Sequence, residues 1–352
     1  MRKFDLVVIG SGPAGRRAAI QAAKLGKSVV VVDDRSSVGG VSVHTGTIPS
    51  KTMRETVLNL TGWREQQFYS RGRDASRSID PSALSERLGK TLEHEIDILE
   101  VQFARNGVSV IQGRASFESS HILQIEKRDT DSTAVEKIEA AHILICVGTR
   151  PYRPDYVPFN DHNVLDSDAI AKNPKIPRSL SVIGAGVIGI EYATIFSAMD
   201  VPVTLIEPLD QFLGFVDKDV IDNFTHQLRD RGMSIRLGCK TKTIQMDPNG
   251  NPIVTLEDGR IVRSEMLLFA AGRMGATASM GLKKIGLLTD NRGRLKVDPG
   301  TMQTDIDHIY AAGDVIGFPS LASTSMEQGR IAACHAFGAP MTKAPEHFPY
   351  GI

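Results

Sequence analysis

Residues 4–15 read FDLVVIGSGPAG, and this stretch decides the fold of the chain. The apolar run from Phe4 to Ile9 is typical of a buried parallel strand. A glycine-rich turn follows at once, formed by Gly10, Ser11, Gly12, Pro13, Ala14 and Gly15. In such a turn the first glycine permits a tight bend, the second lets the backbone approach a pyrophosphate, and the third lets helix and strand pack closely. The stretch predicts the start of a dinucleotide-binding unit, with the phosphates at a helix N-terminus.

The sequence around residues 28–33 supports this interpretation. A second strand, expected over 28–32, ends in Asp33, 23 residues after Gly10. An acid at that place accepts hydrogen bonds from an adenosine ribose. Strand, turn, helix and acid therefore follow one another at the spacing expected of a dinucleotide-binding unit.

The same pattern starts again near residue 180. A strand is expected over 180–183, the turn carries Gly184, Gly186 and Gly189, and a strand over 203–206 ends in Glu207, 23 residues after Gly184. The sequence therefore predicts an α/β protein with two dinucleotide sites.

Composition narrows the class of protein. A chain of 352 residues is long enough for two or three domains. Lys plus Arg and Asp plus Glu both number 41, so no overall field attracts nucleic acid or an acidic membrane. There is no apolar run long enough to span a membrane, and the strand pattern at Phe4 leaves no room for a signal peptide. The three cysteines, Cys146, Cys239 and Cys334, have no metal or C-x-x-C spacing, so we expect packed side chains in a cytoplasmic protein without a metal.

Other segments give expectations about secondary structure. Residues 82–106 carry leucines at helical spacing and end at Asn106-Gly107. We expect a helical segment from Thr52 and a polar loop over 65–80. Short strands are expected over 108–111, 122–125, 138–147 and 266–270, with a linker over 173–177, an antiparallel excursion with turns at 247–250 and 257–259, and a helix over 325–337.

Residues 39–51 read GGVSVHTGTIPSK and resemble the redox-centre segment of the flavoprotein disulfide reductases. This is the pyridine nucleotide-disulfide oxidoreductase family, and the resemblance runs from Phe4 to Ile352. In its disulfide-reducing members two cysteines stand where this chain has Ser42 and Thr47. A hydroxyl cannot form a disulfide, so a reduced flavin must pass its electrons to a second nicotinamide or to an external acceptor. The branch of the family with this pattern is the soluble Si-specific NAD(P)+ transhydrogenases.

The resemblance implies a set of cofactor-binding residues. Residues 308–315, HIYAAGDV, resemble the late flavin motif, whose Asp binds the ribityl chain, and residues 146–149, CVGT, resemble a second flavin segment despite differing in its first two positions. The expected FAD ligands are Gly10, Gly12, Pro13, Ala14, Gly15, Asp33, Gly40, Thr47, Lys51, Gly148, Gly313 and Asp314, with Thr149 carried over beside Gly148. The expected NAD(P) ligands are Gly184, Gly186, Gly189, Glu207 and Gly272.

The resemblance also implies how the domains are arranged. The FAD-binding domain comprises 1–150 and 275–352, and the NAD(P)-binding domain, 151–274, is inserted into it. Relatives continue into a C-terminal interface domain that makes a homodimer. This chain ends before it, either by truncation or as a short gene product, so we expect weak or absent dimerisation.

Lys51 and Glu191 are the expected catalytic pair. By resemblance Lys51 lies near the flavin N5 and pairs with Glu191 in the helix after the second glycine turn. A buried ammonium needs such a partner, and a cation there would stabilise anionic reduced flavin. We interpret His44 as a structural residue, because hydride transfer between nicotinamide and flavin needs little proton chemistry from the protein.

The expected function is transfer of hydride between NADPH and NAD+ through FAD. Glu207 favours an NAD ribose, since a 2′-phosphate would meet like charge there and no Lys or Arg follows directly. Two alternatives stay open at this stage. One is an NAD(P)H diaphorase or oxidase, and the other is a nucleotide-binding form without flavin turnover.

Overall fold

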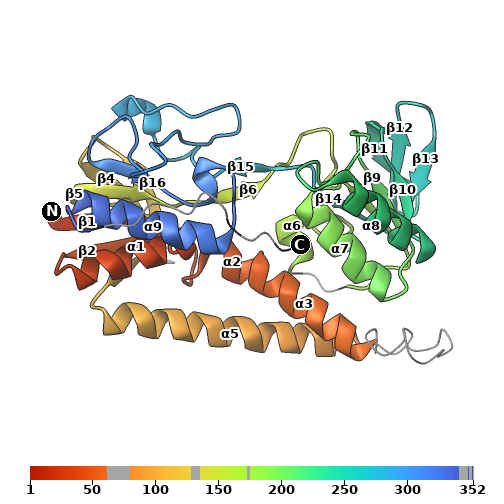
Figure 1. The fold of residues 1–352 in the computed structure, drawn as a ribbon, viewed down its shortest axis with the longest axis horizontal. Coiled ribbons are helices and arrows are strands. Elements are labelled where there is room, and N and C mark those ends of the chain that lie inside the picture. The colour runs from red at the N-terminus through yellow and green to blue at the C-terminus, as the bar shows by residue number, and fades with distance from the viewer. Residues whose placement is uncertain (62–79, 128–134, 173–174, 341–347, 349–350, 352) are drawn as a thin grey trace. The chain divides into compact units, whose positions relative to one another are not determined.

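The structure is a computed structural model, and it describes residues 1–61, 80–127, 135–172, 175–340, 348 and 351. The polar loop expected over 65–80 and the first residues of the expected linker at 173–177 therefore fall largely outside the described residues. The chain forms two compact units, shown in Figure 1. Unit 1 comprises Met1–Thr47, Leu92–Arg150 and Met274–Gly351, and unit 2 comprises Ile48–Thr91 and Pro151–Arg273.

The sheet of unit 1 has a parallel core in the order β3-β2-β1-β5-β16. These strands are β1 (Arg2–Ile9), β2 (Val29–Asp33), β3 (Ser109–Phe117), β5 (Val135–Ile145) and β16 (Ile309–Ala311). The second half of β3 and the first residues of β5 pair antiparallel with β4 (Ile122–Lys127). Because β16 pairs with β5, the chain returns to the first sheet after building unit 2, which confirms the expected insertion.

Helix α1 (Pro13–Lys24) and helix α9 (Ala322–Ala336) lie side by side in unit 1 (Figure 1). They approach closely at Gly329, where a Cβ would lie 2.1 Å from the carbonyl oxygen of Ala14. The sheet buries a continuous apolar cluster that includes Val7, Val30 and Ile143. Glycine at position 329 therefore sets the distance between the two helices.

Three helices connect these elements: α2 (Gly40–His44), α3 (Thr47–Leu60) and α5 (Pro81–Arg105). The helix expected over 82–106 is confirmed as α5, and its residues Leu84, Leu88, Leu99 and Phe103 are buried. Helix α3 starts at Thr47, five positions before the helical pattern identified in the sequence at Thr52. The glycines at 39, 40 and 46 bend the chain just before it.

The sheet of unit 2 is fully parallel, in the order β10-β9-β8-β14-β7. Its strands are β7 (Val164–Asp166), β8 (Leu180–Ile183), β9 (Val203–Ile206), β10 (Ser234–Arg236) and β14 (Met266–Phe269). Helices α7 (Val187–Ala198) and α8 (Lys218–Asp230) share an apolar cluster with one face. The other face packs on the antiparallel strands β11 (Thr241–Met246), β12 (Pro252–Leu256) and β13 (Ile261–Arg263), which confirms the expected excursion.

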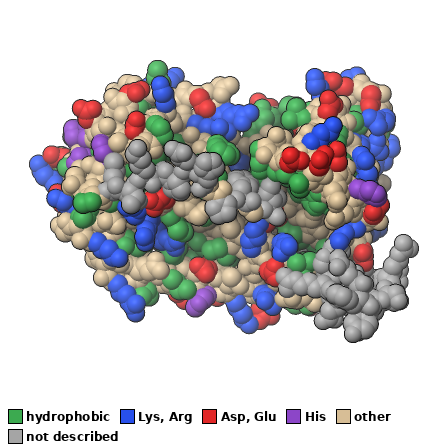
Figure 2. Space-filling view, viewed as in Figure 1, with side chains coloured by type: hydrophobic (Ala, Val, Ile, Leu, Met, Phe, Trp, Pro, Cys, Tyr) green, Lys and Arg blue, Asp and Glu red, His purple; other side chains and the backbone are tan. Residues whose placement is uncertain are grey.

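Short elements complete the fold. They are β6 (Thr149–Pro151), β15 (Arg273–Gly275), α6 (Ser167–Ile170), and the 3-10 turns η2 (Leu282–Ile285) and η3 (Asp314–Ile316). All three cysteines are free and buried, as expected from their spacing. Within the described residues, no helix has the length and apolar character needed to cross a membrane. Figure 2 shows basic and acidic side chains mixed over the visible surface, in keeping with a formal net charge of zero.

Candidate dinucleotide-binding sites

The first glycine turn has the backbone geometry that its spacing predicts. Gly10 has φ +103°, and a Cβ on it would lie 2.3 Å from the carbonyl oxygen of Cys146. A Cβ on Gly15 would lie 1.9 Å from the carbonyl oxygen of Gly10. Both contacts are far inside van der Waals distance, so only glycine permits this approach of strand, turn and helix. Helix α1 begins at Pro13, and Gly12 at its N-cap makes no side-chain capping bond, which leaves N–H groups available at the turn.

Asp33 is held rigidly at the end of β2. Its Oδ2 accepts hydrogen bonds from the backbone N–H and the hydroxyl of Ser11, at 2.7 and 2.5 Å, and its Oδ1 accepts one from the backbone N–H of Arg35 at 2.9 Å. A carboxylate offers about four acceptor sites. One site is thus left for a ribose hydroxyl, in a side chain that is only 6% exposed.

Three distant segments of unit 1 meet at this turn. A Cβ on Gly40 would lie 2.8 Å from the Cα of Gly12, and the backbone N–H of Gly39 donates to the hydroxyl of Ser11 at 2.9 Å. A Cβ on Gly313 would lie 3.3 Å from the Cβ of Ala14. The expected FAD ligands in residues 10–15, 33, 40 and 313 are therefore brought together, although they are far apart in the sequence.

Three other expected FAD ligands lie after β5 and at the starts of η3 and α3. Gly148 adopts φ +62° in open space after β5, and the buried Thr149 begins β6. Asp314 opens the turn η3 directly after Gly313 and is half-buried. Thr47 is exposed at the start of α3.

The segment 39–51 contains an orphaned polar atom that bears on cofactor fit. The hydroxyl of Thr45 is buried and has no hydrogen-bond partner among the described residues. Ser42 donates to the carbonyl oxygen of Gly39 at 3.2 Å. His44 contacts the carbonyl oxygen of Val38 at 3.0 Å, and burial, with the nearby charge of Arg35, lowers its pKa. The segment is thus fixed by local bonds, and one buried hydroxyl is left for a bound group.

The second glycine turn, in unit 2, repeats the first in detail. Gly184 has φ +98°, and a Cβ on it would lie 2.7 Å from the carbonyl oxygen of Ala270. A Cβ on Gly189 would lie 1.9 Å from the carbonyl oxygen of Gly184, the same distance as in the first turn. Gly186 caps α7 with φ −73° and ψ −178°, close to the −62° and −177° of Gly12. The last expected NAD(P) ligand, Gly272, adopts φ +124° after β14.

Glu207 occupies the position of Asp33 in this second unit. Its Oε2 accepts from the backbone N–H of Ala185 at 2.6 Å, and its Oε1 accepts from that of Leu209 at 3.1 Å. Ala185 has no hydroxyl, so Glu207 receives two hydrogen bonds where Asp33 receives three. Two acceptor sites therefore face outward, enough for two ribose hydroxyls.

Lys51 and Glu191 form an ion pair within unit 2. The side chain of Glu191 is 14% exposed and that of Lys51 is 47% exposed. Met53 of α3 belongs to the same apolar cluster as Ile190 and Tyr192 of α7, and this packing brings the two helices together. Glu191 lies on the half-buried stripe of α7, away from that cluster, so its carboxylate is free to meet Lys51.

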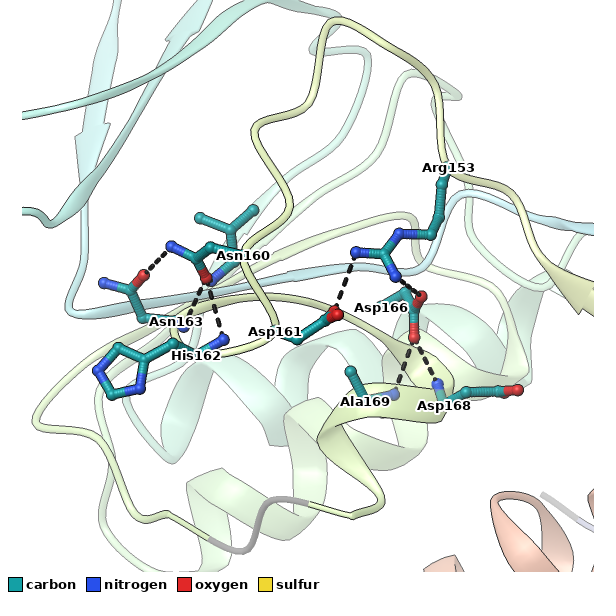
Figure 3. A network of polar contacts seen from close by, with 9 residues as sticks. Arg153, Asn160, Asp161, His162, Asn163, Asp166, Asp168 and Ala169 are labelled. Carbon is teal, nitrogen blue, oxygen red and sulfur yellow. Dashed lines mark hydrogen bonds and ion pairs between the residues drawn. The ribbon is translucent and has the colours of Figure 1, made fainter. Parts of the chain in front are cut away.

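A polar network fixes the carboxyl end of β7 in unit 2, as Figure 3 shows. Arg153 donates to Asp161 at 2.9 Å and lies 3.4 Å from Asp166. Asp166 in turn caps α6 by accepting the backbone N–H groups of residues 168 and 169. Arg273, next to the expected ligand Gly272, donates to Asp168 at 2.9 Å. This end of the sheet is thereby rigid.

Two features of the sites could not be found from motifs. Ser11 stands at a variable position of the glycine pattern, yet its hydroxyl joins Asp33 to the segment at 39. Asp168 is one of several acids in a turn, and only the fold pairs it with Arg273. Neither residue has a sequence signal of its own.

The two glycine turns have the same backbone geometry, and in each unit the next strand ends in a carboxylate. These features define a protein with two dinucleotide-binding units. The family model described as "Pyridine nucleotide-disulphide oxidoreductase" matches residues 4–329. The chain belongs to the pyridine nucleotide-disulphide oxidoreductase family.

Curated relatives are similar over the whole chain. A soluble pyridine nucleotide transhydrogenase of Mycobacterium tuberculosis (strain ATCC 25177 / H37Ra) is 44% identical, covering 100% of this chain and 74% of the relative. The protein with the same name in Marinomonas sp. (strain MWYL1) is 37% identical, again over 100% of this chain and 74% of the relative. The chain thus spans about three quarters of the length of these relatives.

Solved structures share the fold. LpdA from Mycobacterium tuberculosis has a TM-score of 0.87 at 26% identity, over 97% of this chain and 74% of that chain. The HOCl-induced flavoprotein disulfide reductase RclA from Escherichia coli has a TM-score of 0.83 at 27% identity, over 97% and 72%. Proteins of this family and its transhydrogenases use FAD and nicotinamide nucleotides. The tight turn, Asp33 and the orphaned hydroxyl of Thr45 in unit 1 fit such a dinucleotide.

Proposed function

We propose that this protein transfers hydride between NADPH and NAD+ through FAD, as a soluble pyridine nucleotide transhydrogenase. The observation that carries the proposal is the pair of matched dinucleotide turns in a chain that has Ser42 and Thr47 where disulfide reductases have cysteines. Two nucleotide sites without a thiol relay restrict the electrons to flavin and nicotinamide. The relatives named above carry the same activity in their names.

We propose that residues 1–150 and 275–352 form the FAD-binding domain and that residues 151–274 form the NAD(P)-binding domain. The FAD ligands would be the glycines of residues 10–15, Asp33, Gly40, Thr47, Lys51, Gly148, Gly313 and Asp314. The NAD(P) ligands would be Gly184, Gly186, Gly189, Glu207 and Gly272. Both carboxylates are pre-oriented by backbone N–H groups, so little side-chain entropy is lost when a ribose binds.

FAD, when bound, would supply the two-electron redox chemistry of hydride transfer between nicotinamides. The part of the protein in this reaction is to hold and orient the two nucleotides. Lys51 would place a positive charge where negative charge develops, and Glu191 would keep the ammonium oriented and charged. No proton transfer by His44 is required, and the lowered pKa of its imidazole keeps it neutral near pH 7.

An NADH diaphorase or oxidase is the second candidate, and Glu207 favours it. The residues after this acid are Pro208, Leu209 and Asp210, which bring no positive charge for a 2′-phosphate. If NADPH were excluded, the reaction would be the oxidation of NADH by a quinone, a dye or oxygen.

An anaerobic spectral titration tests the proposal. The purified protein should show a flavin spectrum that bleaches with NADPH and returns when an oxidised NAD analogue is added. Bleaching with NADH alone, followed by rapid reoxidation in air, would instead identify the oxidase. Absence of flavin, or flavin that no nicotinamide bleaches, would refute both candidates.

Three further properties belong to the proposal. The balanced charge gives no reason to expect nucleic acid as a partner. Three buried free cysteines fit a reducing, cytoplasmic location. The family resemblance carries an expectation of homodimers for full-length relatives, and sedimentation velocity would give the oligomeric state of this chain.

A further inference from the structure

Arg236 ends β10, the strand that lies next to β9 at the edge of the sheet in unit 2. In the register of the sheet it lies beside Ile206, which lies beside Ile183. The ends of three strands thus form one row, and the glycine turn follows the first of them. The backbone N–H of Glu207 donates to the carbonyl oxygen of Arg236 at 2.9 Å.

The guanidinium of Arg236 has no carboxylate partner among the described residues. It is half-buried, its Nε is buried without a hydrogen-bond partner, and it forms no ion pair within 4 Å in the part of the chain that the structure describes. The neighbouring Arg260 is different, because it donates to Asp258 at 2.7 Å. Hydrogen bonds from Arg260 are the main reason why the pKa of Asp258 is lowered, and the charge of Arg236 adds to them.

The residues directly after Glu207 supply negative charge and no cation. Residues 208–210 are Pro, Leu and Asp. Asp210 lies close to the loop after β10, since its Oδ1 is 2.8 Å from the position of a Cβ on Gly238. A nucleotide with a 2′-phosphate would therefore meet two carboxylates unless a cation on the neighbouring strand offsets them.

The order of the strands gives the direction of a bound adenosine. Nucleotides bind outside the carboxyl ends of the strands, with the pyrophosphate at the glycine turn and the ribose at the acid. Here the turn follows β8 and the acid follows β9, so the adenosine runs toward β10. An arginine near the acid is the group that accommodates a 2′-phosphate, because its planar fork matches phosphate oxygens.

We propose that Arg236 binds the 2′-phosphate of NADP(H) and so lets a site with Glu207 accept both nicotinamide nucleotides. The inference rests on the proposed function in one respect, the assignment of the nicotinamide nucleotides to unit 2. Arg236 would decide between NAD(H) and NADP(H), and it lies on β10 and not in the loop after β9.

Binding of nucleotide fragments tests the inference without any turnover. We would measure the Kd of 2′,5′-ADP and of 5′-AMP by calorimetry, with FAD saturating the flavin site. Arg236→Gln should raise the Kd of 2′,5′-ADP roughly 10- to 100-fold, as expected when a charged hydrogen bond is lost. The Kd of 5′-AMP should change by less than about twofold. Arg178→Gln is the matched control, because Arg178 lies before β8 at the opposite end of the sheet and should change neither Kd. Equal effects on both ligands, or none on either, would overturn the inference.

A measurement on the unchanged protein covers the case in which Arg236→Gln fails to fold. Phosphorus NMR gives the pKa of the 2′-phosphate in bound 2′,5′-ADP. Beside a guanidinium this pKa should fall below its value in the free nucleotide, and beside Glu207 and Asp210 alone it should rise. A raised value would overturn the role of Arg236. Flavin that NADPH fails to bleach, with the fragment results as expected, would reject transhydrogenation and keep the 2′-phosphate site.

Discussion

Replacing Lys51 with Met removes the charge of the ion pair with Glu191 and keeps most of the side-chain volume. The two side chains lie on α3 and α7, and that of Glu191 is 14% exposed. Removal leaves a carboxylate that is mostly buried and has lost its cation.

The cost to folding should be modest. Exposed ion pairs contribute about 0.2–1 kcal/mol, and breaking a fully buried one costs about 3–5 kcal/mol. Since Lys51 is 47% exposed, water can partly solvate the abandoned carboxylate, and we expect a loss of about 1 kcal/mol. The melting temperature should fall by about 2 °C.

The cost to flavin reduction should be much larger. A fixed charge placed where negative charge develops changes a rate by about 10²–10³-fold. Stopped-flow absorbance under anaerobic conditions would give the rate of flavin bleaching by NADPH, and fluorescence would give the Kd of FAD. We expect the rate to fall by this factor and the Kd to change less than about threefold.

Lys90→Met is the matched control, because Lys90 also pairs with a glutamate, Glu86, on exposed helix surface. It should leave the rate unchanged. If Lys51→Met reduced flavin as fast as the unchanged protein, Lys51 would have no part in hydride transfer, and the ion pair would be structural only.

Three other changes follow from the structure. Glu207→Gln removes the charge beside the ribose, so the ratio of KM for NADH to KM for NADPH should rise about tenfold, and an unchanged ratio would mean that the carboxylate does not face the 2′ position. Tyr192→Phe deletes a buried hydroxyl that has no hydrogen-bond partner among the described residues, so thermal melting should show stability unchanged or raised by about 1 kcal/mol; a clear loss would reveal a partner. Burial, and then the charges of His308 and His121, lower the pKa of His142, so folding should weaken as pH falls below about 6.5, where only the unfolded chain takes up the proton. His142→Gln should flatten this dependence in melts across that range, and an identical slope would exclude His142 as its source.

The glycine turns and their acids could be predicted because their requirements are local. A Cβ at Gly10 or Gly184 would overlap a backbone carbonyl, and this steric rule leaves a fixed spacing in the sequence. The packing face of α5 and the burial of the cysteines followed from periodicity and spacing in the same way. The sequence also predicts that there is no thiol relay, because Ser42 and Thr47 stand where disulfide reductases have cysteines.

The sequence predicts the start of α3 too late, because Gly46 and Pro49 hide a helix start that the fold permits. Other features depend on residues far apart in the chain. Ser11 and Gly39 meet only because residues 39–40 pack on the first turn, and no pattern in either segment requires it.

By itself, the sequence determined two nucleotide units, the carboxylate of each, and electron transfer without a disulfide. The tertiary structure alone decided which residues meet these acids: the hydroxyl of Ser11 at Asp33, and the backbone carbonyl of Arg236 at the N–H of Glu207. The physical reason is that backbone sterics act between neighbours in the chain, whereas charges and hydrogen bonds act between whatever groups strand order and helix packing bring within a few ångströms. The row that joins Arg236 to Ile206 exists only because β10 pairs with β9.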